Sequence, residues 1–573
     1  MNDTQSFFGS GVLNIHWFRN DLRLLDNPAL HHTVHLSSSA NGILLPIFIF
    51  DNSRVYGSNV KSKLNSSRKC GPRRAQFILE AVADLRHNLE RCGSGLIVKV
   101  GKPETILGEI ARQMNITSSV VDINTVCQAE ICSEELSINE AVTSHLHSQG
   151  IQFNLHSISA GSTLYDPNTL PFERGVDGIP NAFSPFRKEV EKHCKIGIPL
   201  DAPSNDQLKL PHNIRNTLKE IGCSLDDDYM PTLADLGYNK EDIESISTVD
   251  HRSAMPKGYK GGETFALSRV QEYIWDKDLI KTYFDTRNNM VGANYSTKLG
   301  PWLACGCLSP RYIARECARY EELRVKSKST YWIVFELLVR DYFRFFAMKH
   351  GDAIFYPSGT VRKKRHWDTN PIYFQSWKNG VTGYPLIDAN MRELKATGYM
   401  SNRGRQNVCS FLAIELNIDW RLGAEYFEEA LLDFEVSSNY LNWQNGAGVS
   451  LCTGGRLNRF NIVKQSKTYC DKGGENLRLW CPELQNVPDE FIHEPWLMSE
   501  TEMNECGGQD YPSPIVDPAI HGGAVVDSRG RPKKQGKTKG KATSSNDSSL
   551  PIMKSLPTGS YQFNQSKVYF AAE

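Results

Sequence analysis

Val12-Leu-Asn-Ile-His-Trp-Phe18 and Ile43-Leu-Leu-Pro-Ile-Phe-Ile-Phe50 are two apolar runs rich in β-branched and aromatic residues. Runs of this length and composition are typical of strands buried on both faces. A helical pattern follows over Arg74–Glu90, and shorter strand-like runs follow at Leu96–Val100 and Ser119–Ile123. Strands that alternate with helices predict a parallel sheet, so the amino-terminal part is predicted to be a Rossmann-like α/β domain.

The remainder of the chain divides by composition. The α/β pattern covers residues 11–150, and from 151 to 225 prolines interrupt it, which is typical of an interdomain connector. From 226 to 500 apolar and aromatic helical faces without period-two alternation predict a large all-α domain. Beyond 500 the composition shifts to Gly, Ser, Pro and Lys, with seven basic residues and no acid between Arg529 and Lys541. Residues 501–573 are therefore predicted to be a disordered basic tail.

Charge and cysteine usage narrow the function classes. The 573 residues have a formal net charge of zero, so any DNA contact must come from a local basic patch. Fourteen cysteines occur without a Cys-x-x-Cys pair or histidines at zinc spacing, which favours a reduced intracellular compartment and no metal site. No apolar run approaches the roughly 20 residues of a membrane helix. Met1–Gly11 does not resemble an Arg-rich transit peptide, so cytoplasm or nucleus is expected rather than an organelle.

The strongest functional signal lies in an otherwise apolar, helical stretch between Tyr399 and Trp443. Charges buried in such a stretch are tolerated only when they are paired and hydrogen-bonded, so Arg and Asp residues there indicate a neutralised pair around a ligand. Two tryptophans share the stretch, although Leu or Phe would serve packing alone better. The residues concerned are Asn402, Arg403, Arg405, Gln406, Asp433, Glu435 and Asn439, with Trp420 and Trp443.

A second polar group, Ser296-Thr297-Lys298, lies between Gly292 and Gly300. Two hydroxyls, the neighbouring backbone N–H groups and an ammonium together suit a pyrophosphate. The alternative is an ordinary helix cap, which uses the same residue types. The absence of Gly-x-Gly-x-x-Gly after the first predicted strand argues against the usual dinucleotide site in the α/β domain.

These motifs occur in the order of a known family. The segments that carry the order are Asn14–Pro28, Tyr295–Leu299, Leu308–Arg311, Thr397–Phe411, Asp419–Phe427 and Asn439–Trp443. Together they resemble the photolyase/cryptochrome family over residues 12 to 485. The run Ser-Asn-Arg-Gly-Arg-Gln at 401–406 resembles its cryptochrome DASH branch.

The resemblance implies that FAD binds in the helical domain. Arg405 and Asp433 would pair beside the isoalloxazine ring, with Asp433 also accepting from its N3–H. Asn439 falls nearest flavin N5, where an amide can donate or accept. Glu435 stands where the family more often has Asp, which leaves its contact with the ribityl chain or ring edge open. The positions implied to contact FAD are Tyr283, Ser296, Thr297, Lys298, Leu299, Glu336, Arg340, Asn402, Arg405, Asp433, Glu435 and Asn439.

The resemblance also implies an electron relay of three tryptophans, Trp367, Trp420 and Trp443. An indole is among the side chains most easily oxidised, so a row of them can carry an electron from the surface to a buried excited flavin. Any single tryptophan in a helical protein is more often a core residue. Three tryptophans at matching positions favour the relay.

Glu336 and Arg340 lie four residues apart, on one face of a predicted helix where they could pair. In family members that repair DNA, the Glu contacts the damaged pyrimidines and the Arg contacts flavin. Two stacking rings expected in the lesion pocket are replaced by Val339 and Asn445. Stacking contributes roughly 1–3 kcal/mol per base and extruding bases costs about a few kcal/mol, so single-stranded DNA is the favoured substrate.

Other DNA contacts are predicted from single positions. Asn402 and Gln406 stand where repairers of the (6-4) lesion have histidines, so that activity is not expected. Arg403 and the basic run Arg362–Arg365 could meet phosphates, although such a run is as often a solvated loop.

Glu130, in Gln128-Ala-Glu-Ile-Cys132, matches the acid that grips the pterin of a folate antenna, 5,10-methenyltetrahydrofolate, in this family. A carboxylate can accept two N–H bonds from an aminopterin edge. The alternative is a helix-start acid with no ligand.

The lead hypothesis is a monomeric blue-light flavoprotein that repairs cyclobutane pyrimidine dimers, mainly in single-stranded DNA, by electron transfer from photoexcited reduced FAD. The alternative is a blue-light photoreceptor with a signalling protein partner and little or no repair. A third reading, a flavin oxidoreductase for small molecules, would not need the three tryptophans.

Overall fold

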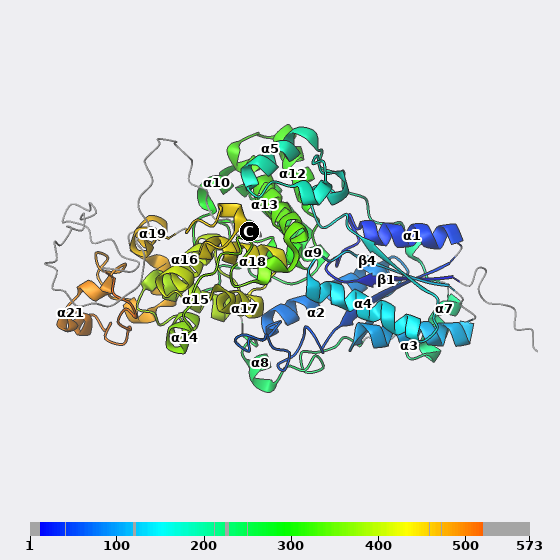
Figure 1. The fold of residues 1–573 in the computed structure, drawn as a ribbon, viewed down its shortest axis with the longest axis horizontal. Helices are drawn as coiled ribbons and strands as arrows, with labels where there is room; N and C mark the ends of the chain where they lie inside the picture. Colours follow the sequence, from blue (N-terminus) through cyan, green and yellow to red (C-terminus); the bar gives the residue numbers. More distant parts are fainter. Residues whose placement is uncertain are drawn as a thin grey trace, which may run out of the picture.

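The computed structural model describes residues 12–518, except 41, 119–121, 211, 224–228, 249, 458 and 471–472. Residues 1–11 and 519–573, which include most of the predicted tail, lie outside the described part. An α/β unit occupies one end of the long axis and a larger helical unit the other (Figure 1). This arrangement confirms the predicted fold class.

The α/β unit is built on a parallel sheet of five strands in the order β3-β2-β1-β4-β5. Its central strand β1 pairs with β2 on one side and with β4 on the other. The fifth strand lies where the sequence predicts the connector, so the sheet extends past residue 150. The strands are β1 Val12–Phe18, β2 Ile43–Phe50, β3 Ile97–Val100, β4 Asp122–Gln128 and β5 Phe153–Ile158.

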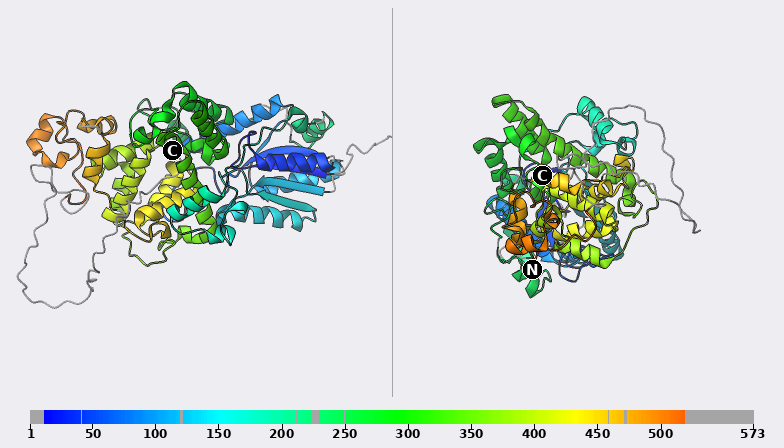
Figure 2. Two further views of the ribbon diagram at one scale, coloured as in Figure 1. Left: turned by 90° about the horizontal axis from the view of Figure 1, so that it is seen from above. Right: turned by 90° about the vertical axis from the view of Figure 1, so that its left-hand side faces the viewer.

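Alternation along the strands divides the core into two faces. Leu13 and Ile15 of β1 share a cluster with α3 and α4, whereas Phe18 packs in the cluster that contains α1 and α2. The strands are apolar on both sides because helices cover both faces, as seen from above in Figure 2. The helices of this unit are α1 Pro28–Ala40, α2 Pro72–Arg91, α3 Pro103–Ser118 and α4 Ser133–Ser148.

The helical unit is organised around α13, whose interior side chains are almost all buried. Helix α18 packs against α13, α16 and α17, which brings the polar stretch of the sequence into the middle of the unit. Helix α7 His212–Glu220 packs in the cluster that contains α3 and α4, and the short α6 Asn205–Leu208 contacts α1, so both belong to the α/β end (Figure 1). The remaining helices are α5 Phe183–His193, α8 Lys240–Glu244, α9 Glu263–Val270, α10 Tyr283–Thr286, α11 Gly300–Ala304, α12 Pro310–Leu323, α13 Lys328–His350, α14 Pro371–Asn379, α15 Pro385–Thr397, α16 Asn402–Ser410, α17 Trp420–Ala430, α18 Val436–Ala447, α19 Ile462–Tyr469, α20 Glu475–Trp480 and α21 Glu500–Glu505.

The loop after β1 joins the two units. Buried Arg23 donates to the carbonyl oxygens of Gly161 at 2.7 Å and Gly306 at 2.8 Å. Glu263 of α9 accepts from the backbone N–H groups of Leu24 and Leu25, each at 2.8 Å. The segment Asn14–Pro28 therefore links the sheet to the helical unit.

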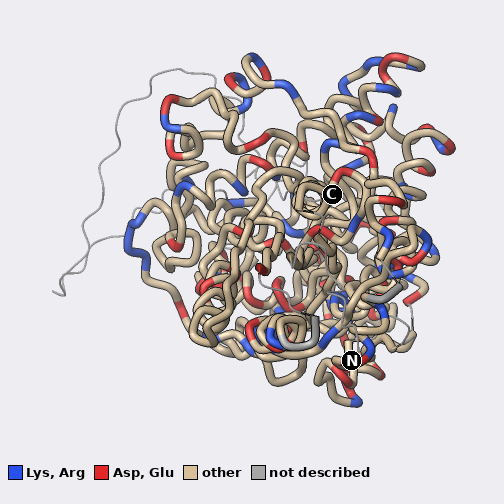
Figure 3. Tube along the Cα trace, turned by 90° about the vertical axis from the view of Figure 1, so that its right-hand side faces the viewer, with Lys and Arg blue, Asp and Glu red and all other residues tan. Residues whose placement is uncertain are grey.

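Charge is evenly mixed over the α/β end of the molecule. Figure 3 shows Lys and Arg interspersed with Asp and Glu on this side, in line with the zero net charge. No helix in the described part of the chain is long and apolar enough to cross a membrane. Within the same residues no group of three or more His, Cys, Asp or Glu side chains could hold a metal ion.

Candidate active site

Helices α16, α17 and α18 approach one another closely because small residues line their contacts. A Cβ atom at Gly423 would lie 2.2 Å from the Trp443 ring, and one at Gly446 would lie 2.3 Å from Cys409 Sγ. Ser401 caps α16, since its Oγ accepts from the Gly404 N–H at 3.0 Å. All nine residues of α16 are buried, including its arginines, so its polar side chains must find partners inside the protein.

Arg405 and Asp433 meet inside this helix group. Arg405 Nη2 donates to Asp433 Oδ2 at 2.8 Å, and Arg405 Nε donates to the Met400 carbonyl oxygen at 2.9 Å. Asp433 Oδ1 is buried and has no hydrogen-bond partner among the described residues. The pair is therefore neutral as a whole but leaves one carboxylate oxygen able to accept.

Asn439 of α18 has a similar half-satisfied side chain. Its Nδ2 donates to the Ala424 carbonyl oxygen of α17 at 3.1 Å, while its Oδ1 is buried without a partner in the described part of the chain. The amide is thus oriented by α17. Its Oδ1 is left as an acceptor for whatever lies beside it, and one of the two Nδ2 hydrogens is used by Ala424.

The segment Ser296–Leu299 lies just before α11. Ser296 Oγ is fully buried and lacks a partner among the residues described. Arg269 holds this backbone through a 3.1 Å bond from its Nε to the Thr297 carbonyl oxygen. Lys298 has a positive φ of 60°, and its Nζ donates to the Tyr399 hydroxyl at 2.6 Å.

The Lys298 ammonium also lies over two aromatic rings. Its Nζ is 3.3 Å from the Tyr295 ring centroid and 4.1 Å from that of Tyr399. These two cation–π contacts hold the ammonium in place. Its predicted contact with a pyrophosphate stays a prediction. Tyr283 of α10 is buried, as is Asn402, the first residue of α16.

The three predicted relay tryptophans belong to one buried cluster. Trp443 and Trp420 are fully buried, and Trp367 keeps 9% of its surface exposed. The Nε1 atoms of Trp367 and Trp420 donate to the same oxygen, the carbonyl of Pro357, at 3.1 and 3.3 Å. Trp443 Nε1 has no acceptor in the described structure. Trp443 and Trp420 are therefore closed off from solvent, and Trp367 is the one of the three with exposed surface.

Glu336 and Arg340 share a helix but do not pair with each other. Glu336 Oε1 accepts from Arg287 Nη1 and from Trp332 Nε1, both at 2.9 Å. Arg340 Nη2 and Nε donate to the two carboxylate oxygens of Glu435 at 2.8 and 3.1 Å. Glu336 thus pairs with Arg287, just after α10, and Arg340 pairs with Glu435, just before α18. Both side chains are buried, so the surface pair that their spacing allowed is not what the described contacts show.

Four of the predicted DNA contacts are buried, whereas three residues of the basic run Arg362–Arg365 are exposed. Arg403 Nη1 donates to Gln406 Oε1 and its Nη2 to Asn288 Oδ1, both at 2.9 Å. Val339 and Asn445 have 1% and 4% exposed surface. The contact of Arg403 with DNA stays a prediction. No sequence motif around Arg287 or Trp332 indicates that these residues contact Glu336.

Glu130 lies at the junction of the two units, after β4. Its Oε1 accepts from Asn20 Nδ2 at 2.8 Å, and its Oε2 lies 3.8 Å from Arg344 Nη2 of α13. Burial, together with the charge of Glu130, raises the pKa of the neighbouring Glu135 to about 8. Arg344 also lies 3.9 Å from Glu435, so a row of charges joins the Glu130 region to α18.

Comparisons with known proteins agree with these two units. Residues 14–205 match the family described as DNA photolyase, and residues 332–527 match the FAD binding domain of DNA photolyase. Cryptochrome DASH, chloroplastic/mitochondrial, of Ostreococcus tauri is 41% identical over 515 residues, covering 88% of this chain and 90% of that protein. Cryptochrome DASH of Gloeobacter violaceus is 42% identical over 504 residues, covering 87% and 92%. The chain belongs to the photolyase/cryptochrome family.

A solved structure of the family shares the whole fold. The crystal structure of the Synechocystis sp. PCC6803 cryptochrome has a TM-score of 0.76 at 39% identity and covers 88% of this chain and 96% of that one. The helical unit thus contains the family's FAD-binding domain.

The interior of the helical unit fits FAD. Three buried oxygens, Ser296 Oγ, Asp433 Oδ1 and Asn439 Oδ1, have no partner among the described residues. Leaving a buried polar atom unsatisfied costs about 1–3 kcal/mol, so these three oxygens are available to a polar ligand. FAD has phosphates and a ring edge that both donates and accepts, which suits these groups.

Proposed function

We propose that the protein uses blue light and reduced FAD to split cyclobutane pyrimidine dimers, mainly in single-stranded DNA. The observation that carries the proposal is the way the Glu336 side chain is held. The resemblance puts this carboxylate at the position that contacts the lesion in repairing relatives, and Arg287 and Trp332 both donate to its Oε1. A carboxylate oriented in this way can accept a hydrogen bond from a base edge without first reorganising.

Bound FAD supplies a photoexcited one-electron donor to the dimer. Asp433 Oδ1 would accept from the ring edge, and Arg405 balances the charge of that carboxylate. The bond from Nδ2 to Ala424 orients the Asn439 amide and leaves its Oδ1 as an acceptor. An acceptor at the N5 position favours a protonated N5 over a bare one, so Asn439 favours reduced flavin.

The three tryptophans would reduce the oxidised flavin by passing electrons to it. Trp443 cannot lose its indole proton locally, because its Nε1 lacks an acceptor in the described structure. An electron taken from it is therefore best replaced from Trp420 and then from Trp367, which reaches solvent. Repair that starts from chemically reduced FAD does not need this step, so Trp367→Phe should leave such repair unchanged.

The preference for single strands follows from Val339 and Asn445. Neither offers a ring on which a flipped base could stack, and each missing stack forgoes roughly 1–3 kcal/mol. Extruding a dimer from a duplex costs about a few kcal/mol, which single-stranded DNA does not incur. The double change Val339→Trp with Asn445→Tyr should therefore strengthen binding of dimer-containing duplex more than of single strands.

Repair kinetics of Glu336 variants test the proposal. Dithionite-reduced protein under blue light should lose repair of a single-stranded dimer in Glu336→Ala and regain part of it in Glu336→Gln, which keeps an acceptor. Flavin content serves as the control for folding. Full repair by Glu336→Ala would contradict the assignment.

A photoreceptor is the second candidate, and the burial of Val339 and Asn445 favours it. Side chains that the protein itself covers do not meet DNA, and flavin photoreduction through the tryptophans would then change the binding of a protein partner. Absence of repair in wild type, together with normal photoreduction, would select this function.

We also propose a folate antenna at Glu130. The carboxylate lies at the junction of the units, and its Oε2 is held only by the 3.8 Å contact with Arg344 among the contacts described. It can still accept from an aminopterin edge.

A further inference from the structure

Arg365 lies against the ring of Trp367, at the outer end of the tryptophan relay. Its guanidinium carbon is 4.1 Å from the ring centroid. Its Nη1 donates to the Ala447 carbonyl oxygen at 2.8 Å, and its Nη2 donates to the Ala413 carbonyl oxygen at 2.9 Å. A longer bond of 3.3 Å reaches Asn417 Oδ1. These three hydrogen bonds hold the guanidinium against the ring.

No carboxylate neutralises this cation among the described residues. Its acceptors are two backbone carbonyls and one amide, whereas Arg405 and Arg287 each face a carboxylate. Burial lowers the pKa of Arg365, yet a guanidinium stays protonated throughout the accessible range. Its positive charge therefore acts on the Trp367 ring at every working pH.

We propose that Arg365 is a positioning residue that limits the lifetime of the radical cation on Trp367. The inference rests on the relay in the proposed function. When Trp420 has lost an electron, Trp367 supplies one electron to it and is left as a radical cation. A cation over a neutral ring is attractive, but the same cation repels a ring that has become positive.

This repulsion speeds both ways in which the radical cation disappears. The electron can return from Trp420, which restores neutral Trp367 and moves the positive charge inward. Alternatively the indole Nε1–H proton can leave to water, which gives the neutral radical. The Pro357 carbonyl holds the N–H but is not a base, so water takes the proton. Arg365 shortens the radical cation's life by both routes.

The expected size follows from the distance. Two unit charges about 4 Å apart in water repel by ~1 kcal/mol, which corresponds to about a fivefold change in an equilibrium or a rate. Removing the charge should therefore lengthen the radical-cation lifetime by about fivefold, and more if the low-dielectric side of the ring dominates.

Flash photolysis of the flavin-loaded, oxidised protein tests this directly. Tryptophan radical cation and neutral radical are followed by their separate absorption bands in wild type, Arg365→Gln, Arg365→Lys and Lys363→Gln. Lys363 belongs to the same basic run but is exposed and has no described ring contact, so its change is a matched loss of one charge. Unfolding midpoints are measured for all four proteins.

The radical cation should live about fivefold longer in Arg365→Gln only, with slower appearance of the neutral radical, and should keep its wild-type lifetime in Arg365→Lys. A purely structural role predicts that the Gln and Lys variants both lose stability while both radical lifetimes stay at the wild-type value, and that result would overturn the proposal. Equal lifetimes in Arg365→Gln and wild type would end this proposal alone. No tryptophan radical in wild type would end the relay as well.

Discussion

Two buried polar regions of the molecule differ in how completely the protein satisfies them. Between α16 and α18, Asp433 and Asn439 each keep one oxygen without a partner in the described structure. At the junction of the units, Glu435 accepts from Arg340 and from Ser438 Oγ at 2.7 Å, and Glu130 accepts from Asn20. Because buried polar groups require partners, the first region is complete only with a ligand. The carboxylates of the second region already have protein partners, and among the described contacts only Glu130 Oε2 keeps room to accept from a further ligand.

The largest expected effect is on flavin binding. Asp433→Asn should reduce FAD affinity by about 10- to 100-fold, since it removes a charged acceptor worth roughly 1.5–3 kcal/mol and leaves the Arg405 cation unpaired. Flavin content after gel filtration and a titration of the flavin-free protein measure the change. Glu130→Gln, an equally conservative change at a buried carboxylate, should keep its flavin. Loss of FAD in both variants would erase the difference between the two regions.

The next largest effect distinguishes a relay tryptophan from a neighbouring tryptophan outside the relay. Trp377 is fully buried and lies 6.0 Å from the Trp443 ring, so it is a neighbour of the relay without a place in the proposed row. Trp420→Phe should abolish most photoreduction of oxidised flavin, whereas Trp377→Phe should retain it. Photoreduction rates under blue light with an external reductant provide the measurement. If photoreduction is slower in Trp377→Phe than in Trp420→Phe, the electron passes through Trp377 of α14 instead.

A smaller effect concerns the antenna. Glu130→Ala should remove any near-ultraviolet folate band from the purified protein while leaving flavin absorbance in place. The difference spectrum between variant and wild type after reconstitution with 5,10-methenyltetrahydrofolate reports it. An unchanged folate band would show that the pterin, if bound, does not use this carboxylate.

The smallest effect concerns pH. Burial raises the pKa of Glu135 to about 8 from 4.5, so the folded protein holds a proton that the unfolded chain releases between these values. The free energy of unfolding should therefore fall as pH rises through this window. Glu135→Gln should flatten that slope, measured by denaturant unfolding at a series of pH values. An identical slope in the variant would place the titration elsewhere.

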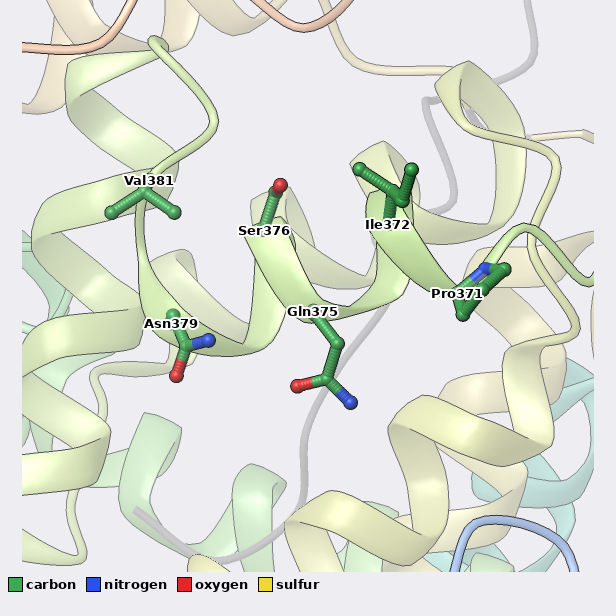
Figure 4. Close-up of a pocket in the computed structure, with 6 residues that line it drawn as sticks. All are labelled: Pro371, Ile372, Gln375, Ser376, Asn379 and Val381. Carbon is green, nitrogen blue, oxygen red and sulfur yellow. The ribbon is translucent and has the colours of Figure 1, made fainter.

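The hollow beside α14 shows why shape alone does not find the site. Figure 4 shows Pro371, Ile372 and Val381 with Gln375, Ser376 and Asn379 around it. Ile372 is 70% exposed, and this lining holds no charged side chain. The residues that argue for function lie instead in the tightly packed interior between α16 and α18.

The sequence predicts the sheet well where strands are continuously apolar. Val12–Phe18 and Ile43–Phe50 form strands over the predicted residues, because helices cover both faces. The edge strand Phe153–Ile158 was missed because only Phe153 is buried, and the run Phe-Asn-Leu-His-Ser-Ile has no continuous apolar character. An edge strand needs less apolar surface than a central one, so its signal is weak.

In the site, the sequence predicts which residues belong to the site better than it predicts their contacts. Arg405 and Asp433 are expected to meet, and they do: Arg405 lies on α16 and Asp433 in the turn between α17 and α18. Spacing on one helix allowed Glu336 to pair with Arg340, but the cation that contacts Glu336 comes from another element, Arg287. The contact of Lys298 with Tyr399 spans 101 residues, and no local pattern reports it.

The most direct test of the account is the repair of one cyclobutane pyrimidine dimer in matched single- and double-stranded oligonucleotides. Chemically reduced wild-type protein is given each substrate, under blue light and in the dark, and the loss of the dimer is measured. Repair should occur only in light and should be faster on the single strand. Equal repair of the duplex would contradict the role of Val339 and Asn445, and no repair of either strand would contradict the proposed function.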